Sequence, residues 1–173
     1  EASRVARVTT DAGAVTFGSG LSGISGVVSV SNSLIGSTTD NQVGNFGVTA
    51  LSNGHYVVLS PSWDNGAISN VGAATFGSGV SGISGLISAS NSLVGSTANN
   101  QVGIGGVTAL SNGNYVVSSH SWDNGAASDV GAVTWGSGTT GVTGAVSASN
   151  SLVGQVASAG MQSPTTVDNV NGT

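Results

Sequence analysis

Cysteine and lysine are both absent from this 173-residue chain, and charge of either sign is scarce. Without cysteine there can be no disulfide framework and no thiolate metal site. Charged residues make up only 5% of the sequence, and Arg4 and Arg7 are its only arginines. Binding to nucleic-acid phosphates or to anionic membranes depends on clusters of Lys and Arg. The composition and the net charge of −5 therefore argue against both kinds of partner.

Proline and long hydrophobic runs are also scarce. The chain has two prolines and no run of 18 apolar residues, so we expect neither a proline-rich disordered segment nor a membrane-spanning helix. Residues 1–10 have no hydrophobic stretch of the signal-peptide kind, so a secreted form would carry its signal elsewhere. Regularly spaced Val, Ile and Leu among 29 glycines predict a folded domain with an uncharged polar surface.

What the sequence has in abundance is repetition. The segment ALSNGHYVVLSPSWDNG at 50–66 returns as ALSNGNYVVSSHSWDNG at 109–125. The same spacing relates two further sets, Phe17, Phe76 and Trp135, and Leu34, Leu93 and Leu152. We therefore predict a single domain, residues 1–173, made of three 59-residue repeats at about 1–59, 60–118 and 119–173, with the first and last hairpin split between the termini.

Each repeat predicts four short strands and no helix. In one copy these are 101–110, 115–122, 131–136 and 144–154, and Val, Ile, Thr and aromatic residues dominate the strands as a set. Asn-Gly pairs follow the first two strands, and they predict type I′ turns in which both central residues have positive φ. The sequence thus predicts an all-β fold of four-stranded antiparallel sheets.

Two further architectures stay open beside a β-propeller-like arrangement of these sheets. A propeller blade is a four-stranded antiparallel sheet, and a repeat of this length suits a large blade. A three-sheet β-prism-like body would close naturally with three repeats. A β-solenoid would need a shorter sub-repeat within each period, of which the sequence shows only a weak trace.

The repeat resembles the FG-GAP blade of integrin-α-type β-propellers. Val43-Gly44 and Val102-Gly103 stand at its start, Ser60-Pro61 stands at its corner, and 72–76 and 131–135 match its third strand. This resemblance implies a propeller blade. Members of that family often bind calcium in an Asp-rich hairpin loop, but the loops here, 51–54 and 110–113, contain no carboxylate. We therefore expect no calcium and no other cofactor.

The amino-acid sequence of the repeat is also similar to repeat arrays in large secreted bacterial exoproteins of the filamentous-haemagglutinin kind. That resemblance implies an extracellular or cell-surface location and an adhesive or structural role. It names no ligand.

Motifs for catalysis are weak. The pattern G-x-G-x-x-G occurs at 18–23, 77–82 and 136–141, but the segments that follow indicate strands rather than the helix that a dinucleotide site needs. His55 and His120 stand at different phases of the repeat, which is unsuitable for a repeated catalytic or zinc site. Of the seven carboxylates, only Asp64 and Asp123 share a phase in both complete hairpins. We expect no enzymatic activity.

The best candidate for a ligand site is a repeated triplet, Trp63, Asp64 and Asn65 with its copy Trp122, Asp123 and Asn124. An exposed indole beside a carboxylate and an amide is suited to holding a sugar ring. Alternatively the tryptophan packs over its hairpin, and the aspartate accepts backbone N–H groups in the turn. Phe17, Phe76 and Trp135 we expect to pack between sheets.

These patterns favour a non-catalytic extracellular module with a structural or adhesive role, and the alternative is a glycan-binding lectin. The chain ends, 3–10 and 165–173, have the phases of two halves of one hairpin. Since an unpaired strand edge promotes aggregation, we expect self-association through these terminal strands. Surface glycans are the other candidate partner.

Overall fold

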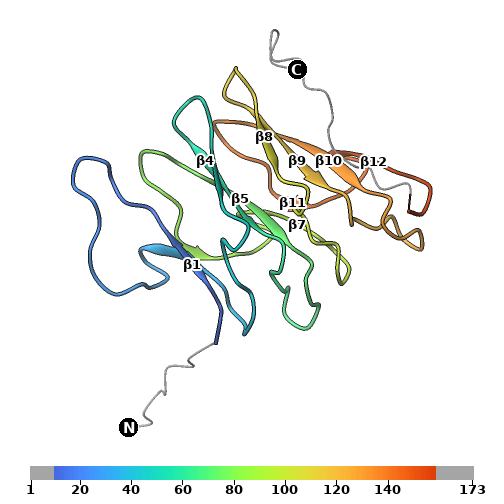
Figure 1. Cartoon of the computed structure of the whole chain (residues 1–173), viewed down its shortest axis with the longest axis horizontal. Helices are drawn as coiled ribbons and strands as arrows, with labels where there is room; N and C mark the ends of the chain where they lie inside the picture. The colour runs from blue at the N-terminus through green and yellow to red at the C-terminus, as the bar shows by residue number, and fades with distance from the viewer. Residues whose placement is uncertain (1–9, 159–173) are drawn as a thin grey trace.

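The computed structural model describes residues 10–158, and these form twelve strands with no helix among them (Figure 1). The first sheet contains β1 (Ala14–Thr16), β2 (Ser33–Ile35) and β6 (Gly85–Leu86). The second sheet contains β3 (Val48–Ala50), β4 (Tyr56–Ser60), β5 (Ala73–Gly77), β7 (Leu93–Val94) and β11 (Gly144–Ala145). The third sheet contains β8 (Val107–Ala109), β9 (Tyr115–Ser119), β10 (Ala132–Gly136) and β12 (Ser151–Val153). The predicted all-β fold is confirmed.

Counted from the first strand of its hairpin, each complete repeat has four strands that pair antiparallel, in the order β3-β4-β5-β7 in the second repeat and β8-β9-β10-β12 in the third. A fifth strand crosses to the preceding repeat, where β6 pairs parallel with β2 and β11 pairs parallel with β7. The segment 144–154, predicted as one strand, is therefore two strands in two sheets. The side chain of Asn150 breaks it, because Oδ1 accepts the Ser147 N–H and Nδ2 donates to the Ala145 carbonyl, both at 2.9 Å.

The Asn-Gly turns differ from the predicted type I′ form. Between β3 and β4, Gly54 has a φ of +86° while Asn53 is not among the residues with positive φ. The Leu51 N–H donates to the His55 carbonyl, and the Gly54 N–H donates to the Leu51 carbonyl. The loop is thus a type I turn that ends in a left-handed glycine. The second pair, Asn124-Gly125, lies inside the longer connection between β9 and β10, where Asn124 forms a bridge with Ala127.

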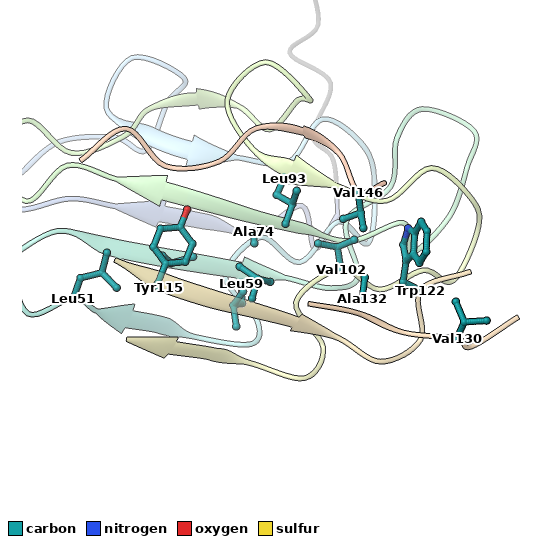
Figure 2. Close-up of a cluster of buried hydrophobic side chains, with 12 residues drawn as sticks. Leu51, Leu59, Ala74, Leu93, Val102, Tyr115, Trp122, Val130, Ala132 and Val146 are labelled. Carbon is teal, nitrogen blue, oxygen red and sulfur yellow. The ribbon is translucent and has the colours of Figure 1, made fainter. Parts of the chain in front are cut away.

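The three sheets stack face to face along the long axis of the molecule (Figure 1). In the middle sheet Val57 and Val58, which point to opposite faces of β4, are both fully buried. Val58 belongs to the cluster shared with the first repeat, and Val57 belongs to the cluster shared with the third. Figure 2 shows this second cluster, to which Leu59, Tyr115 and Trp122 also belong. The core is therefore two layers of side chains, one between each pair of neighbouring sheets.

The two layers use the same positions of the repeat. Side chains of one class point toward the preceding repeat, and they are Val58, Trp63, Val71 and Ala73 in the second repeat and Val117, Trp122, Val130 and Ala132 in the third. They meet a second class on the preceding sheet, Leu34 and Val43 in the first repeat and Leu93 and Val102 in the second. Each repeat thus has one face of each class, which is the reason for its strict period.

In the described residues the stack is open and none of its sheets closes into a barrel. The propeller ring, the prism and the solenoid remain predictions. Among residues 10–158 there is no helical segment with the length and hydropathy of a membrane span. Apart from Thr10, the terminal strands predicted to pair, 3–10 and 165–173, lie outside the described residues.

Candidate functional site

The two tryptophans of the repeated triplet are buried. Trp63 is 2% exposed and Trp122 is 4% exposed, and each follows a strand that ends in serine, Ser60 or Ser119. Figure 2 shows Trp122 in the cluster that contains Ala132 and Val146. The indole faces that a sugar ring would need are covered by the neighbouring repeat. Of the two alternatives that the sequence left open at this corner, the exposed indole is wrong, and the tryptophan is packed.

The aspartates of the triplet hold the backbone of their own loops. Asp64 Oδ1 accepts the Asn70 N–H at 2.7 Å, and Asp123 Oδ1 accepts the Asp129 N–H at 2.8 Å. Both N–H groups belong to residues with positive φ, +50° at Asn70 and +52° at Asp129. A non-glycine residue in this region is strained, and a charge-assisted hydrogen bond offsets part of that cost.

The asparagines close a tight turn in the same loops. The backbone of Asn65 exchanges hydrogen bonds with Ile68, and that of Asn124 does so with Ala127. Asn124 Nδ2 also donates to the Gly154 carbonyl at 3.3 Å. All three residues of the triplet thus have structural contacts, and the structure does not bring the two triplets together into one site.

An exposed indole does exist, at the third member of another repeated set. Trp135 in β10 is 52% exposed. Its counterparts Phe17 and Phe76 each stack on a tyrosine of the next repeat. Phe17 lies parallel to Tyr56 with 6.0 Å between the ring centroids, and Phe76 lies parallel to Tyr115 with 6.4 Å. The expected packing between sheets thus holds for Phe17 and Phe76, while Trp135 lies on the outer face of the last described sheet.

A surface pocket of about 310 Å³ lies between β1 and the hairpin of β3 and β4. Its lining includes Phe17, Val48, Ala50, His55 and Tyr56. The equivalent ring of the third repeat, Tyr115, is 1% exposed because β3 and β4 complete the sheet that covers it. The pocket thus lies where the first described sheet has no counterparts of β3 and β4. Sequence reasoning did not identify this pocket.

Titratable groups in the described residues do not form a reactive cluster. His55 Nδ1 accepts the Gly79 N–H at 3.0 Å, and its ring lies edge-on to Phe76. His120 Nδ1 lies 3.2 Å from the Ser121 hydroxyl. Residues 10–158 contain no group of three His, Asp or Glu side chains that could hold a metal ion. Burial raises the pKa of Tyr115 to about 12, which keeps its hydroxyl neutral.

The chain matches the model of one protein family, described as a repeat of unknown function (DUF5650), over residues 6–45, 50–104 and 109–163. The second and third matches are offset by one full period of the repeat found in the sequence. Comparison with curated proteins and with solved structures found no match. The comparisons give no support for the resemblance to integrin-type blades or to haemagglutinin-like exoproteins.

Proposed function

We propose that this chain, which belongs to the family of DUF5650 repeats, is a non-catalytic structural and adhesive module that works outside the cell. One observation carries the proposal: the residues that recur with the period of the repeat are used to pack one repeat on the next. Repeats that contact only their neighbours form extended bodies with large surfaces, which suits a spacer or a platform for contacts.

The composition of the surface supports an extracellular role. Residues 8–173 contain no Lys or Arg, so proteases of the trypsin class have no cleavage site there. Exposed turns are built from Ser, Thr, Asn and Gly, and hydrogen bonds between their side chains and the backbone fix them, as at Ser88 and Asn91. A chain with no Lys or Arg after Arg7 is suited to a compartment rich in proteases.

Antibody labelling of intact cells of the producing organism, followed by proteolysis, tests the location. We expect labelling without permeabilisation, its loss after proteinase K and its persistence after trypsin. Labelling that needs cell lysis would contradict an extracellular role.

A glycan array tests the adhesive part and its alternative, a lectin at the Trp-Asp-Asn corner. Because Trp63 and Trp122 are buried, we expect no sugar binding that depends on either indole. The informative variants are Trp122→Ala and Trp135→Ala, the second of which removes an exposed indole. Binding that Trp122→Ala abolishes without loss of folding would instead support the lectin.

A further inference from the structure

The repeats are joined by an exchange of one short strand. Gly85 and Leu86 of β6 pair parallel with Leu34 and Ile35 of β2, and Gly144 and Ala145 of β11 pair with Leu93 and Val94 of β7. The residue after each donor strand continues the ladder, since the Ile87 N–H donates to the Ile35 carbonyl and the Val146 N–H donates to the Val94 carbonyl. The same donor and acceptor thus occur twice within the chain.

A third acceptor stands at one end of the stack. Among residues 10–158, β12 occupies an edge of the third sheet and pairs only with β10, through Leu152 and Val153. The equivalents of Leu152 in the other two repeats, Leu34 and Leu93, are fully buried, whereas Leu152 is 66% exposed. This edge also lacks the charged side chains that usually protect an exposed strand, because residues 144–158 contain none.

A third donor stands at the other end. Residues 26–27 have the phase of Gly85-Leu86 and Gly144-Ala145 but belong to no strand of the described residues. Gly26 has a φ of +118°, in the same region as Gly85 at +107° and Gly144 at +93°. The asparagine that clamps each donor is also in place, because Asn32 Nδ2 donates to the Val27 carbonyl at 2.9 Å. The donor therefore has its paired conformation already.

The side chains around this donor confirm that a face is uncovered. Val28 is 55% exposed, while its equivalents Ile87 and Val146 are 4% and 3% exposed. Ile24 on the same segment is 51% exposed. Val28 and Leu152, whose equivalents are buried at the internal interfaces, are thus exposed at the two ends of the stack, which marks these ends as interaction surfaces.

We propose that the two ends bind each other between copies of this chain. The segment 26–28 of a second copy pairs parallel with β12, placing Gly26 opposite Leu152 and Val27 opposite Val153, and Val28 covers the exposed Leu152. Donor and acceptor lie at opposite ends of the stack (Figure 1), so the rigid array of one chain does not bring them together. The contact is heterologous, and it generates head-to-tail filaments or rings.

This inference extends the proposed structural role by naming its partner, but it depends only on the geometry of the repeat. It also differs from pairing of the terminal hairpin halves, because the segments that it uses are inside the described residues. Sedimentation of the purified chain tests it without reference to location or adhesion, so its failure would leave the extracellular role standing.

The experiment is analytical ultracentrifugation of the wild type, Leu152→Asp and Val28→Asp across a range of micromolar concentrations. Wild type should show masses that rise with concentration beyond the monomer. Each variant has one blocked end and one intact end. Every contact between two copies of the same variant would need the blocked end, so each variant alone should lose every species above the monomer. Because a buried unpaired carboxylate is costly, neither variant should associate with itself.

Mixing the two variants is the decisive arm. The intact donor of Leu152→Asp fits the intact acceptor of Val28→Asp, so the mixture should form one-to-one dimers and nothing larger. Val80→Asp, at an 86% exposed position in a loop of the second repeat, is the matched control and should associate like wild type. Circular dichroism verifies that every variant is folded. A wild type that stays monomeric, variants that still self-associate, or a mixture that stays monomeric would each overturn the proposal.

Discussion

At the scale of single residues, place in the stack decides what a repeated side chain does. Tyr56 and Tyr115 occupy the same position of the repeat and are each followed by two valines, yet Tyr115 is fully covered and Tyr56 lines a surface pocket. Phe76 and Trp135 share a phase, yet only Trp135 lies half exposed. The difference is the presence of a complete neighbouring sheet, and it gives matched pairs for testing burial.

Trp122→Ala should destabilise the fold by about 3–5 kcal/mol, because it removes a buried aromatic side chain from the layer between the second and third sheets. Trp135→Ala, at an exposed position, should change the free energy of unfolding by only about 0.5 kcal/mol. Urea denaturation of both variants at equal dilute concentration measures the difference. Similar values for the two would show that Trp122 is not part of the core.

Tyr115 should make the fold sensitive to high pH. Its pKa is about 12 in the folded chain and 10.0 in the ordinary case, so the unfolded chain loses the proton first as pH rises. Stability from this group is complete below pH 10 and falls between pH 10 and 12, by at most about 1.4 kcal/mol per pH unit.

Tyr115→Phe is the control for that dependence. The buried Tyr115 hydroxyl lies near the Val142 backbone, which lowers its pKa slightly, but no hydrogen bond of normal geometry forms there within the described residues. Its removal should therefore cost little at pH 7. Denaturation midpoints at pH 8, 10 and 11.5 should fall less steeply for Tyr115→Phe than for wild type. Equal slopes would assign the alkaline loss to other groups.

The sequence identifies repeated residues well but places them poorly. Trp63, Asp64 and Asn65 recur as a triplet, and recurrence fits both a binding site and a packing motif. Choosing between them requires knowing which residues of the neighbouring repeat lie above the indole. The contact between the indole and the neighbouring repeat joins residues that are far apart in the sequence. A local pattern of apolar residues therefore cannot predict it.

At the scale of strands, side chains of asparagine decide where pairing stops. Asn32, Asn91 and Asn150 each accept a serine N–H three residues before them and donate to a carbonyl five residues before them. The turn that each one closes separates a strand given to the preceding sheet from a strand kept in its own sheet.

Asn91→Ala should loosen the exchanged strand β6. It removes two hydrogen bonds to the backbone, one from the Ser88 N–H to Oδ1 and one from Nδ2 to the Leu86 carbonyl, at about 1 kcal/mol each. It also removes the acceptor of the Ser92 and Ser88 hydroxyls. Urea denaturation should show a loss of about 2 kcal/mol, and amide exchange at β6 should accelerate. Ser90→Ala in the same turn removes only an exposed hydroxyl contact and should be nearly neutral. A neutral Asn91→Ala would contradict the clamp.

Element type was predictable where residues alternate or Val and Thr cluster, and three of the four strands predicted for the third repeat lie at or inside their expected ranges. The pairing of β11 with β7 of the preceding repeat was not predictable from the sequence. A strand this short has too few side chains to show a period, and its partner is in another repeat. Turn type failed for a related reason, because Asn-Gly suits both a type I′ turn and a type I turn followed by a left-handed glycine.

At the scale of the whole molecule, the stack has an interior sheet and two end sheets. The middle sheet is covered on both faces, whereas each end sheet has an outer face in the described residues. In arrays of this kind stability is close to a sum over repeats and the interfaces between neighbours. Local opening should therefore cost most in the middle and least at the ends.

Hydrogen exchange followed by mass spectrometry should show this gradient. At dilute concentration, amides of β4 and β5 should exchange slowest, while β1 and β12 should exchange fastest among the strands, since fewer buried contacts oppose their opening. Strands β1, β5 and β10 occupy equivalent positions of the repeat, so a difference in exchange rate among these three strands reports their place in the stack. Uniform protection along the chain would show a single cooperative unit instead of a stack.

Raising the concentration then separates the free stack from the assembled one. If copies bind head to tail, the amides of residues 27–28 and of β12 gain protection together, because they form one ladder across the contact. Those of β4 and β5 stay unchanged, because their partners are already in place within the chain. Protection that rises at one end only would contradict a ladder between the two ends and point to contact between like ends.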